Sequence, residues 1–249
     1  MGMAVPLGIA IVLGLAIATF LTFVAIRLPR EQSFRGALHC VRCGRRLAAW
    51  QAVAVVGWLA QGGRGRCCNR SLPWVILFGE VAYIVTLAVL VLRLGFSFNL
   101  FYYALICAVL VVTGVVDWQH RLIYTIPTLG TAAFALVAAP FVAGHSFVNA
   151  LVGMLVAGVL FVLFFVLAQF LFPGRSAPFG LGDVYLSLLL GAAFGLLQLA
   201  PVLFVGMILA GVFSLAIMIV RALGRSTPTY ISYGSFLCLG AIGYLLFST

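Results

Sequence analysis

Lysine and acidic side chains are the scarcest groups in this sequence. Its 249 residues include no lysine, two aspartates and two glutamates, and charged residues make up only 7% of the chain, against roughly 25% in ordinary soluble domains. A soluble protein of this composition would have no way to cover its surface. The net charge of +10 comes from arginine alone, and its distribution predicts membrane topology and no nucleic-acid partner.

Apolar runs fill most of the chain, at or near the roughly 20 residues that cross a bilayer as a helix. Hydrophobic residues account for 65% of the sequence, and the mean hydropathy is +1.27. Because lipid forces backbone groups to pair within each helix, the runs predict an all-α polytopic membrane protein with about eight transmembrane helices, in contact with membrane lipids. The runs are residues 4–26, 73–92, 99–116, 125–143, 147–172, 184–198, 200–220 and 230–247.

The composition changes completely between the first and second runs, which predicts three regions. Residues 1–26 are expected to form the first transmembrane helix, retained because no basic residue precedes it as in a cleaved signal peptide. Residues 27–72, with nine of the fourteen arginines and four of the six cysteines, are expected to be a cytoplasmic loop with a zinc knuckle. Residues 73–249 would form a seven-helix membrane core.

The arginines also predict the orientation. If the 27–72 loop is cytoplasmic, alternate connections place Arg121, Arg175, Arg221 and Arg225 on the same side, and only Arg93 falls outside. Such an excess is the positive-inside pattern. The same alternation places Asp117 and Asp183 at the cytoplasmic ends of their helices, on one face of the membrane.

Asp117 and Asp183 are the two candidate catalytic residues. An ionisable residue beside a transmembrane run is a functional candidate by default, although each could instead cap a helix or pair with an arginine. Two carboxylates about 3 Å apart share one proton, so one can activate water while the other polarises a carbonyl. Gly180 and Gly182, beside Asp183, would let an extended substrate backbone approach.

Four cysteines of the loop predict a metal site. Cys40 and Cys43 form a Cys-x-x-Cys pair, and Cys67 and Cys68 lie downstream, which favours structural zinc over disulfides in the cytoplasm. Adjacent side chains diverge, so His39 is an alternative ligand to Cys67. Four reduced thiols without metal are the alternative for the whole cluster.

The order and spacing of these motifs resemble those of type IV prepilin peptidases, the leader peptidase/N-methyltransferases of pilus and type II secretion systems. The resemblance covers nearly the whole chain and implies an intramembrane-type aspartyl protease of the bacterial inner membrane. It further implies cleavage of prepilin or pseudopilin leaders at the cytoplasmic face, with Asp117 and Asp183 as the catalytic pair. The residues that carry it are Phe20-Leu21, Arg27-Leu28-Pro29, Cys40-Val41-Arg42-Cys43-Gly44, Trp58-Leu59, Gly63 to Cys68, Glu80, Asp117 to Pro127 and Gly180-Leu181-Gly182-Asp183.

The chain departs from this family at several places, two of which bear on its activity. Tyr185 stands where lysine is usual, and the second cysteine pair has Gly65 in place of its first cysteine, with Cys67 beside Cys68. In the family this loop is linked to methylation of the new N-terminus by S-adenosylmethionine, but the residues show no glycine-rich methyl-donor signature. A peptidase with methyltransferase activity and one without it both stay open. The alternative from another class is a transporter or scaffold whose aspartates bind protons or a cation.

Overall fold

Helices make up nearly all of the described structure. The computed structural model describes residues 4–32, 39–40, 43–46, 53–64, 67–69, 71, 73–171, 180–224 and 231–248. Within these ranges, strand-like pairing is limited to two isolated bridges in the loop region. The elements are α1 (Ala4–Arg27), the 3-10 turn η1 (Leu28–Arg30), α3 (Ala54–Ala60), α4 (Trp74–Leu94), α5 (Phe98–His120), α6 (Thr125–Ala138), the 3-10 turn η2 (Ala139–Phe141), α7 (Phe147–Leu171), α8 (Leu181–Ala222) and α9 (Tyr233–Ser248).

The expectation of an all-α membrane protein is confirmed. Among the described residues, α1, α4, α5, α7 and α8 are long and apolar enough to cross a membrane, and two apolar helices are shorter. The predicted runs 184–198 and 200–220 lie in one element, α8, which breaks at Gly195 (φ 69°, ψ 175°). The structure therefore divides these two runs earlier than the sequence does, at the residue whose backbone is left-handed.

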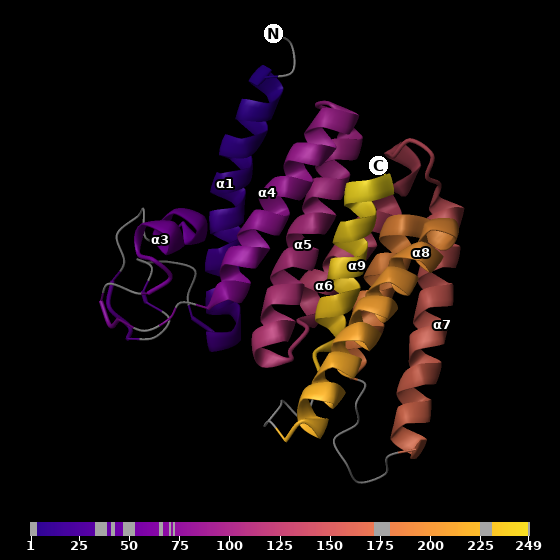
Figure 1. The fold of residues 1–249 in the computed structure, drawn as a ribbon. Helices are drawn as coiled ribbons and strands as arrows, with labels where there is room; N and C mark the ends of the chain where they lie inside the picture. The colour runs from indigo at the N-terminus through magenta and orange to yellow at the C-terminus, as the bar shows by residue number, and fades with distance from the viewer. Residues whose placement is uncertain are drawn as a thin grey trace.

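The helices run side by side, and the start of α1 and the end of α9 lie at the same end of the bundle (Figure 1). Arg27 ends α1 and His120 ends α5 at the opposite end, whereas Arg93 lies in the last turn of α4. Arg175 and Arg225, which the topology prediction also uses, lie outside the described residues. The described part of the chain thus separates Arg27 from Arg93 along the bundle, as the alternation of antiparallel helices requires.

Glycines bring α7 and α8 into backbone contact. A β-carbon on Gly191 would overlap the backbone of Gly153, so neither position has room for a side chain. Small residues permit this close approach between membrane helices, where packing replaces the hydrophobic effect as the source of association. Next to this seam, the hydroxyl of Tyr102 on α5 donates to the carbonyl of Ala193, 3.1 Å away, just before the break at Gly195. The first half of α8 is therefore fixed against both α7 and α5.

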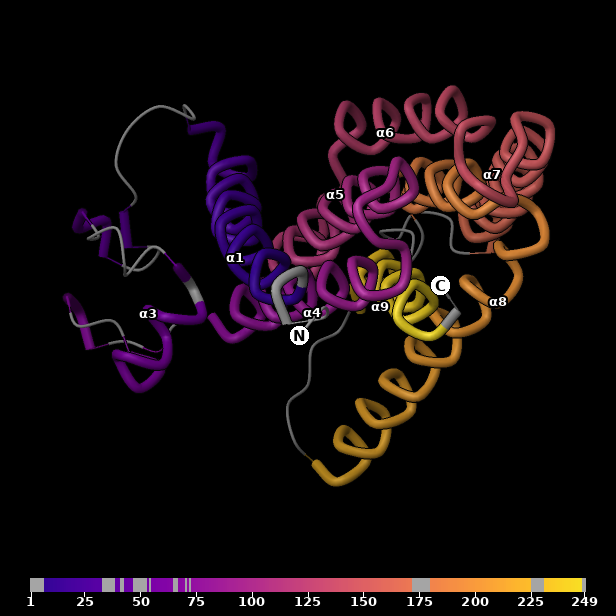
Figure 2. The backbone as a smooth tube through the Cα atoms, turned by 90° about the horizontal axis from the view of Figure 1, so that it is seen from above, coloured from indigo at the N-terminus to yellow at the C-terminus, as the bar shows by residue number. Residues whose placement is uncertain are grey.

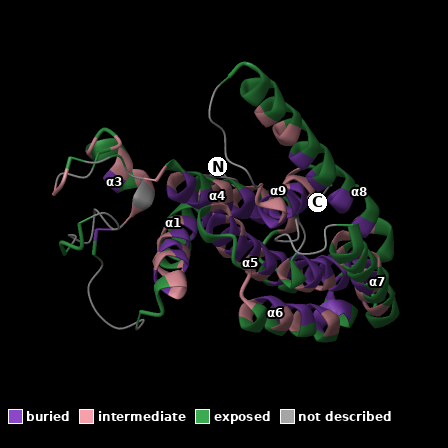
Figure 3. Ribbon diagram, turned by 90° about the horizontal axis from the view of Figure 1, so that it is seen from below, coloured by how far each residue is buried: buried purple, intermediate pink, exposed green. Residues whose placement is uncertain are grey.

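Two polar side chains lie next to the break in α8: Asn149, in the first turn of α7, and His145, just before α7. Asn149 accepts a hydrogen bond from the backbone N–H of Leu196 (3.1 Å), and its amide lies 3.3 Å from His145 Nδ1. A β-carbon on Gly195 would overlap the Asn149 amide. Beyond the break, α8 packs against α9 near Gly206 and Gly240, and its last turns project away from the other helices (Figures 2 and 3). Most residues of this second half are exposed. In a membrane protein this apolar surface is available to lipid.

Glu80 joins the loop region to the helical core. It lies on α4, is only 1% exposed, and accepts a hydrogen bond from the backbone N–H of Val55 at the start of α3 (2.8 Å). A buried carboxylate is costly unless it is hydrogen-bonded. This contact gives Glu80 a structural role, because it anchors α3 to α4.

Candidate active site

Asp117 lies in the last turn of α5 and is 5% exposed. The helix ends because Arg121 adopts a left-handed conformation (φ 56°), while its backbone N–H donates to the Asp117 carbonyl at 2.8 Å. The chain then passes through residues 121–124 without regular structure before α6 begins. This sharp end places the Asp117 carboxylate at one end of the bundle and brings Ile123 beneath it.

The first turn of α9 holds the Asp117 carboxylate. Ser235, the third residue of α9, donates to Asp117 Oδ2 twice, from its backbone N–H at 2.7 Å and from its hydroxyl at 2.9 Å. The first four N–H groups of a helix have no partner within the helix, and the helix dipole is positive at that end. Asp117 therefore acts as the capping carboxylate of a helix that is 118 positions away in sequence.

Asp183 lies in the first turn of α8 and is 9% exposed. Its backbone N–H donates to the Gly180 carbonyl at 3.1 Å, and its Oδ2 accepts from the Gly180 N–H, also at 3.1 Å. This reciprocal pair is the backbone form of a capping box. The helix-capping role that the sequence left open for Asp183 is therefore real, and it orients the carboxylate.

Both carboxylates meet at Gly234. A β-carbon placed on Gly234 would lie 3.1 Å from Asp117 Oδ2 and 3.3 Å from Asp183 Oδ1. The two oxygens are therefore separated by no more than the sum of these distances, which is within the reach of one bridging water. Three elements that are distant in sequence, the end of α5 and the starts of α8 and α9, thus form one buried acidic site.

Ile123 fills the space that glycines leave beside the carboxylates. A β-carbon on Gly182 would lie 2.8 Å from Ile123 Cβ, and one on Gly234 would lie 2.8 Å from Ile123 Cδ1. A β-carbon on Gly180 would meet nothing closer than 3.8 Å. The two glycines of the Gly180-to-Asp183 segment therefore differ: Gly180 leaves open space, and Gly182 accommodates Ile123.

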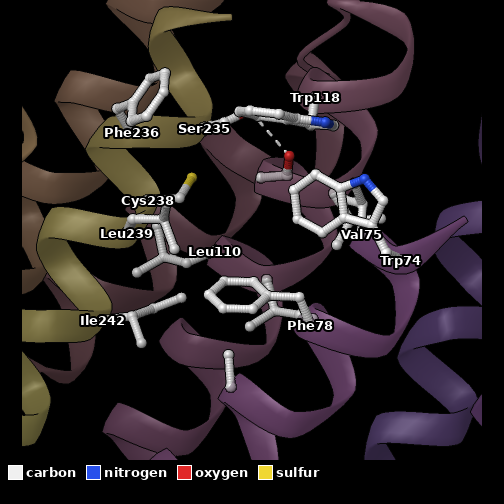
Figure 4. Close-up of a pocket in the computed structure, with 15 residues that line it drawn as sticks. Trp74, Val75, Phe78, Leu110, Trp118, Ser235, Phe236, Cys238, Leu239 and Ile242 are labelled. Carbon is white, nitrogen blue, oxygen red and sulfur yellow. Dashed lines mark hydrogen bonds between the residues drawn. The ribbon is translucent and has the colours of Figure 1, made fainter. Parts of the chain in front are cut away.

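An apolar cavity of about 190 Å³ lies between α4, α5 and α9, on the other side of Ser235 (Figure 4). Besides its hydrogen bond to Asp117, the Ser235 hydroxyl lies 3.0 Å from the carbonyl of Gly114, a residue that also lines the cavity. Trp118 borders the cavity and packs against Trp74, Phe213 and Phe236 with ring centroids 5.5–5.9 Å apart. Aromatic rings thus border the cavity next to the residue that holds Asp117.

A second candidate site is formed by the four loop cysteines. The Sγ atoms of Cys40, Cys43, Cys67 and Cys68 all lie within 4.8 Å of one another, and the Cys43 thiol donates to Cys67 Sγ at 3.2 Å. Tetrahedral zinc with Zn–S bonds of about 2.3 Å places its sulfurs about 3.8 Å apart. The residues present therefore fit a tetrahedral thiolate-binding metal, and the adjacent Cys67 and Cys68 both reach the cluster.

The backbone around the cysteines supports this arrangement. The Cys40 N–H donates to the Arg45 carbonyl at 2.8 Å and the Gly44 N–H donates to the Cys40 carbonyl at 2.9 Å, so backbone hydrogen bonds hold Cys40 against Gly44 and Arg45. His39 lies in the bridge with Arg46, and it is not among the four residues whose ligand atoms converge. The pKa of the Cys67 thiol is raised to about 12, first by its hydrogen bond with Cys43. Metal binding would have to displace the thiol protons.

Two family models match the chain over adjacent segments. Residues 12–94 match the bacterial peptidase A24 N-terminal domain, and residues 104–215 match the type IV leader peptidase family. The four clustered cysteines lie in the first segment, and Asp117 and Asp183 lie in the second. Gly234 and Ser235 lie beyond both.

Curated relatives share one name, prepilin leader peptidase/N-methyltransferase. The protein from Myxococcus xanthus (strain DK1622) is 29% identical over 226 residues, which cover 87% of this chain and 64% of the relative. The one from Legionella pneumophila is 27% identical over 206 residues, or 82% of this chain and 69% of the relative. The one from Pseudomonas aeruginosa is 25% identical over 253 residues, or 92% and 86%. The chain thus spans slightly less than two thirds of the Myxococcus protein.

No solved structure matches the chain. The two family models lie in the same order as the motifs that first indicated the resemblance, and the relatives align along most of the sequence. The chain belongs to the type IV leader peptidase family.

Proposed function

We propose that this chain is a membrane aspartyl endopeptidase that cleaves the leader of type IV prepilin-like proteins, with Asp117 and Asp183 as its catalytic pair. The observation that carries the proposal is the convergence of both buried carboxylates on Gly234. The family match favours this reading over a transporter or scaffold. The names of the relatives supply the substrate class, prepilins, and pseudopilins follow from the same family resemblance.

The chemistry follows from the proximity of two carboxylates in a buried site. Two such groups do not ionise together easily, so the pair carries one proton. The ionised carboxylate takes a proton from water as the water oxygen attacks the peptide carbonyl, and the protonated carboxyl group hydrogen-bonds the carbonyl oxygen. Burial strengthens both interactions because it excludes competing water. No metal ion is needed for this step.

The proposed substrate enters with its apolar helix in the bilayer and its leader at the cytoplasmic surface. In support, Arg27, Arg30 and Arg121 lie at or just beyond the ends of α1 and α5, the end of the bundle that also holds Asp117. Arg93 ends α4, at the other end. If each half of α8 crosses separately, the chain crosses the membrane eight times, and the positive-inside rule puts the carboxylates on the cytoplasmic side.

In the cytoplasmic loop, the proposed zinc ion is structural. Cys40, Cys43, Cys67 and Cys68 would hold it, joining two short knuckles that have no apolar core of their own. Methylation by S-adenosylmethionine is suggested only by the names of the relatives. Mass spectrometry of the N-terminus of a processed pilin, after co-expression, distinguishes a bifunctional enzyme from a peptidase alone.

The proposal is tested by Asp117→Asn and Asp183→Asn. Each variant is purified in detergent, shown by thermal unfolding to be folded, and mixed with a prepilin whose leader loss is followed by gel mobility. We expect both variants to lose cleavage completely. An asparagine amide can neither take up the proton from water nor share a proton with the remaining carboxylate, so either substitution removes the pair. Glu31→Gln, which changes an exposed carboxylate, is the matched control and should cleave normally. Cleavage by either aspartate variant would refute the assignment.

A further inference from the structure

Ser235 is the polar residue that the peptidase mechanism has not yet used. It is 4% exposed, and both of its hydrogen-bond donors point at the same carboxylate oxygen, Asp117 Oδ2. One donor, the backbone N–H, would be present with any residue except proline. The other, the hydroxyl, is specific to serine or threonine. Hydrogen bonds to an ionised carboxylate are short and about twice as strong as bonds between neutral groups.

The two carboxylates differ in what holds them. Asp183 Oδ2 accepts one hydrogen bond, from Gly180 at 3.1 Å, and Asp117 Oδ2 accepts two shorter ones. Each carboxylate lies at the positive end of a helix, Asp183 at α8 and Asp117 at α9, but Asp117 also lies in the last turn of α5, at the negative end of that helix. The helix dipoles therefore do not favour ionisation of Asp117 over Asp183. The hydrogen bond from the Ser235 hydroxyl does, because it stabilises negative charge on Asp117.

We infer that Ser235 is a positioning residue that keeps Asp117 ionised, so that Asp117 is the general base and Asp183 is the general acid of the pair. The inference rests on the proposed peptidase function. In the first step a water O–H bond breaks, its proton moves to Asp117, the water oxygen bonds to the peptide carbon, and the Asp183 proton moves to the carbonyl oxygen. In the second step the C–N bond breaks, the nitrogen takes the proton from Asp117, and Asp183 regains a proton from the intermediate's hydroxyl group.

The Gly114 carbonyl lets Ser235 follow this cycle. The single hydroxyl hydrogen of Ser235 can donate to Asp117 Oδ2 at 2.9 Å or to the Gly114 carbonyl at 3.0 Å. When Asp117 is ionised, the charge draws the hydroxyl hydrogen. When Asp117 carries the proton taken from water, the hydroxyl can turn to Gly114 and no buried donor is left unpaired.

Other charged or titratable groups also act on the pair. Arg121 directly follows the end of α5, Tyr233 and Cys238 act on the carboxylates from α9, and Asp183 itself comes from α8. A change at Ser235 leaves all of these groups in place, so its effect can be separated from theirs.

The experiment measures kcat/KM for prepilin cleavage against pH for Ser235→Ala and Ser235→Thr. Loss of the hydroxyl should move the acid limb of the Ser235→Ala profile to higher pH by about one unit, because ionisation of Asp117 becomes harder. Ser235→Thr, which keeps the hydroxyl, should restore the wild-type limb. Ser187→Ala removes another buried hydroxyl, one that donates only to backbone carbonyls, and should leave the limb unmoved.

The inference would be overturned if the acid limb of the Ser235→Ala profile did not move, or if kcat/KM fell by the same factor at every pH. If that variant does not fold, Ser235→Cys supplies a weaker donor at the same position and should shift the limb in the same direction by less. The aspartate variants separate this result from the proposed function. Active Asp117→Asn would end the peptidase assignment itself, whereas inactive Asp117→Asn with an unmoved Ser235→Ala limb would end only the role given to Ser235.

Discussion

Ile123 packs against Gly234 so closely that a β-carbon on Gly234 would lie 2.8 Å from Ile123 Cδ1. The same β-carbon would also lie 3.1 Å and 3.3 Å from the two carboxylates. Real β-carbons do not make contacts as short as 2.8 Å, and the contacts with the carboxylates would also be tight, so a side chain here forces the neighbouring groups apart. Gly234 is therefore a spatial requirement of the acidic site.

Gly234→Ala is expected to lower prepilin cleavage by about a hundredfold, the order of loss that a displacement near 1 Å can cause at a catalytic group. Gly243→Ala, on the same helix but with nothing within 4 Å of the new β-carbon, should cleave at the wild-type rate. Initial rates at equal folded concentration provide the comparison. Equal activity of the two variants would show that Gly234 has no special role.

Ile123→Val should restore activity to Gly234→Ala but not to Gly182→Ala. It removes Cδ1, the atom that meets Gly234→Ala, so the double variant should regain part of the lost activity. It keeps Cβ, the atom 2.8 Å from a β-carbon on Gly182, so Gly182→Ala should stay impaired in the same background. Gly180→Ala keeps the N–H that Asp183 accepts and should lose less activity than Gly182→Ala. Rescue of both sites, or of neither, would contradict this account of Ile123.

The cysteine cluster predicts one zinc ion per chain. Serine in place of Cys40, Cys43, Cys67 or Cys68 should lower the zinc content of the purified protein, because each thiolate supplies one of four bonds. Cys107→Ser, in the buried part of α5, and His39→Ala should retain the metal. Elemental analysis after dialysis measures the content. Loss of zinc from His39→Ala with retention in Cys67→Ser would restore histidine as the fourth ligand.

The burial of His145 leads us to predict that acid lowers the stability of the fold. Burial lowers its pKa, an effect that the nearby carbonyls of Ala192 and Ala193 partly offset, although Nε2 forms no hydrogen bond among the described residues. A lowered histidine pKa means that the unfolded chain binds the proton more readily. The contribution of neutral His145 to the stability of the fold is therefore fully present above the pKa of histidine in the unfolded chain, near 6.5, and is lost as the pH falls below that value. Thermal unfolding at pH 7.5 and pH 5 should show a smaller decrease in Tm for His145→Asn than for the wild type.

The helices were predictable because hydropathy alone demands them. A long apolar run in lipid has no other way to pair its backbone, so the runs at residues 73–92 and 99–116 correspond closely to α4 and α5. The break of α8 at Gly195 was not predictable in position. It depends on Asn149, on another helix, which occupies the space a side chain would need and accepts a hydrogen bond from the interrupted backbone.

The acidic site was predictable only in part. Counting antiparallel helices was enough to place Asp117 and Asp183 at one end of the bundle, where the structure has them. It could not identify Ser235, since a serine before an apolar run is usually taken as the cap of its own helix. Nor could it show that Gly182, which is predicted to let a substrate backbone approach, also makes room for Ile123. The division of the chain into three regions, with boundaries after residues 26 and 72, remains a prediction.

The cavity behind Ser235 has a pharmacological consequence. Its lining is almost entirely apolar and aromatic, and it borders the residue that orients Asp117 without including either carboxylate. A small hydrophobic compound lodged there would press on the start of α9 and shift Ser235, instead of competing for the carboxylates. Inhibitors of this kind would slow turnover while leaving substrate affinity unchanged, and they would need no resemblance to a peptide.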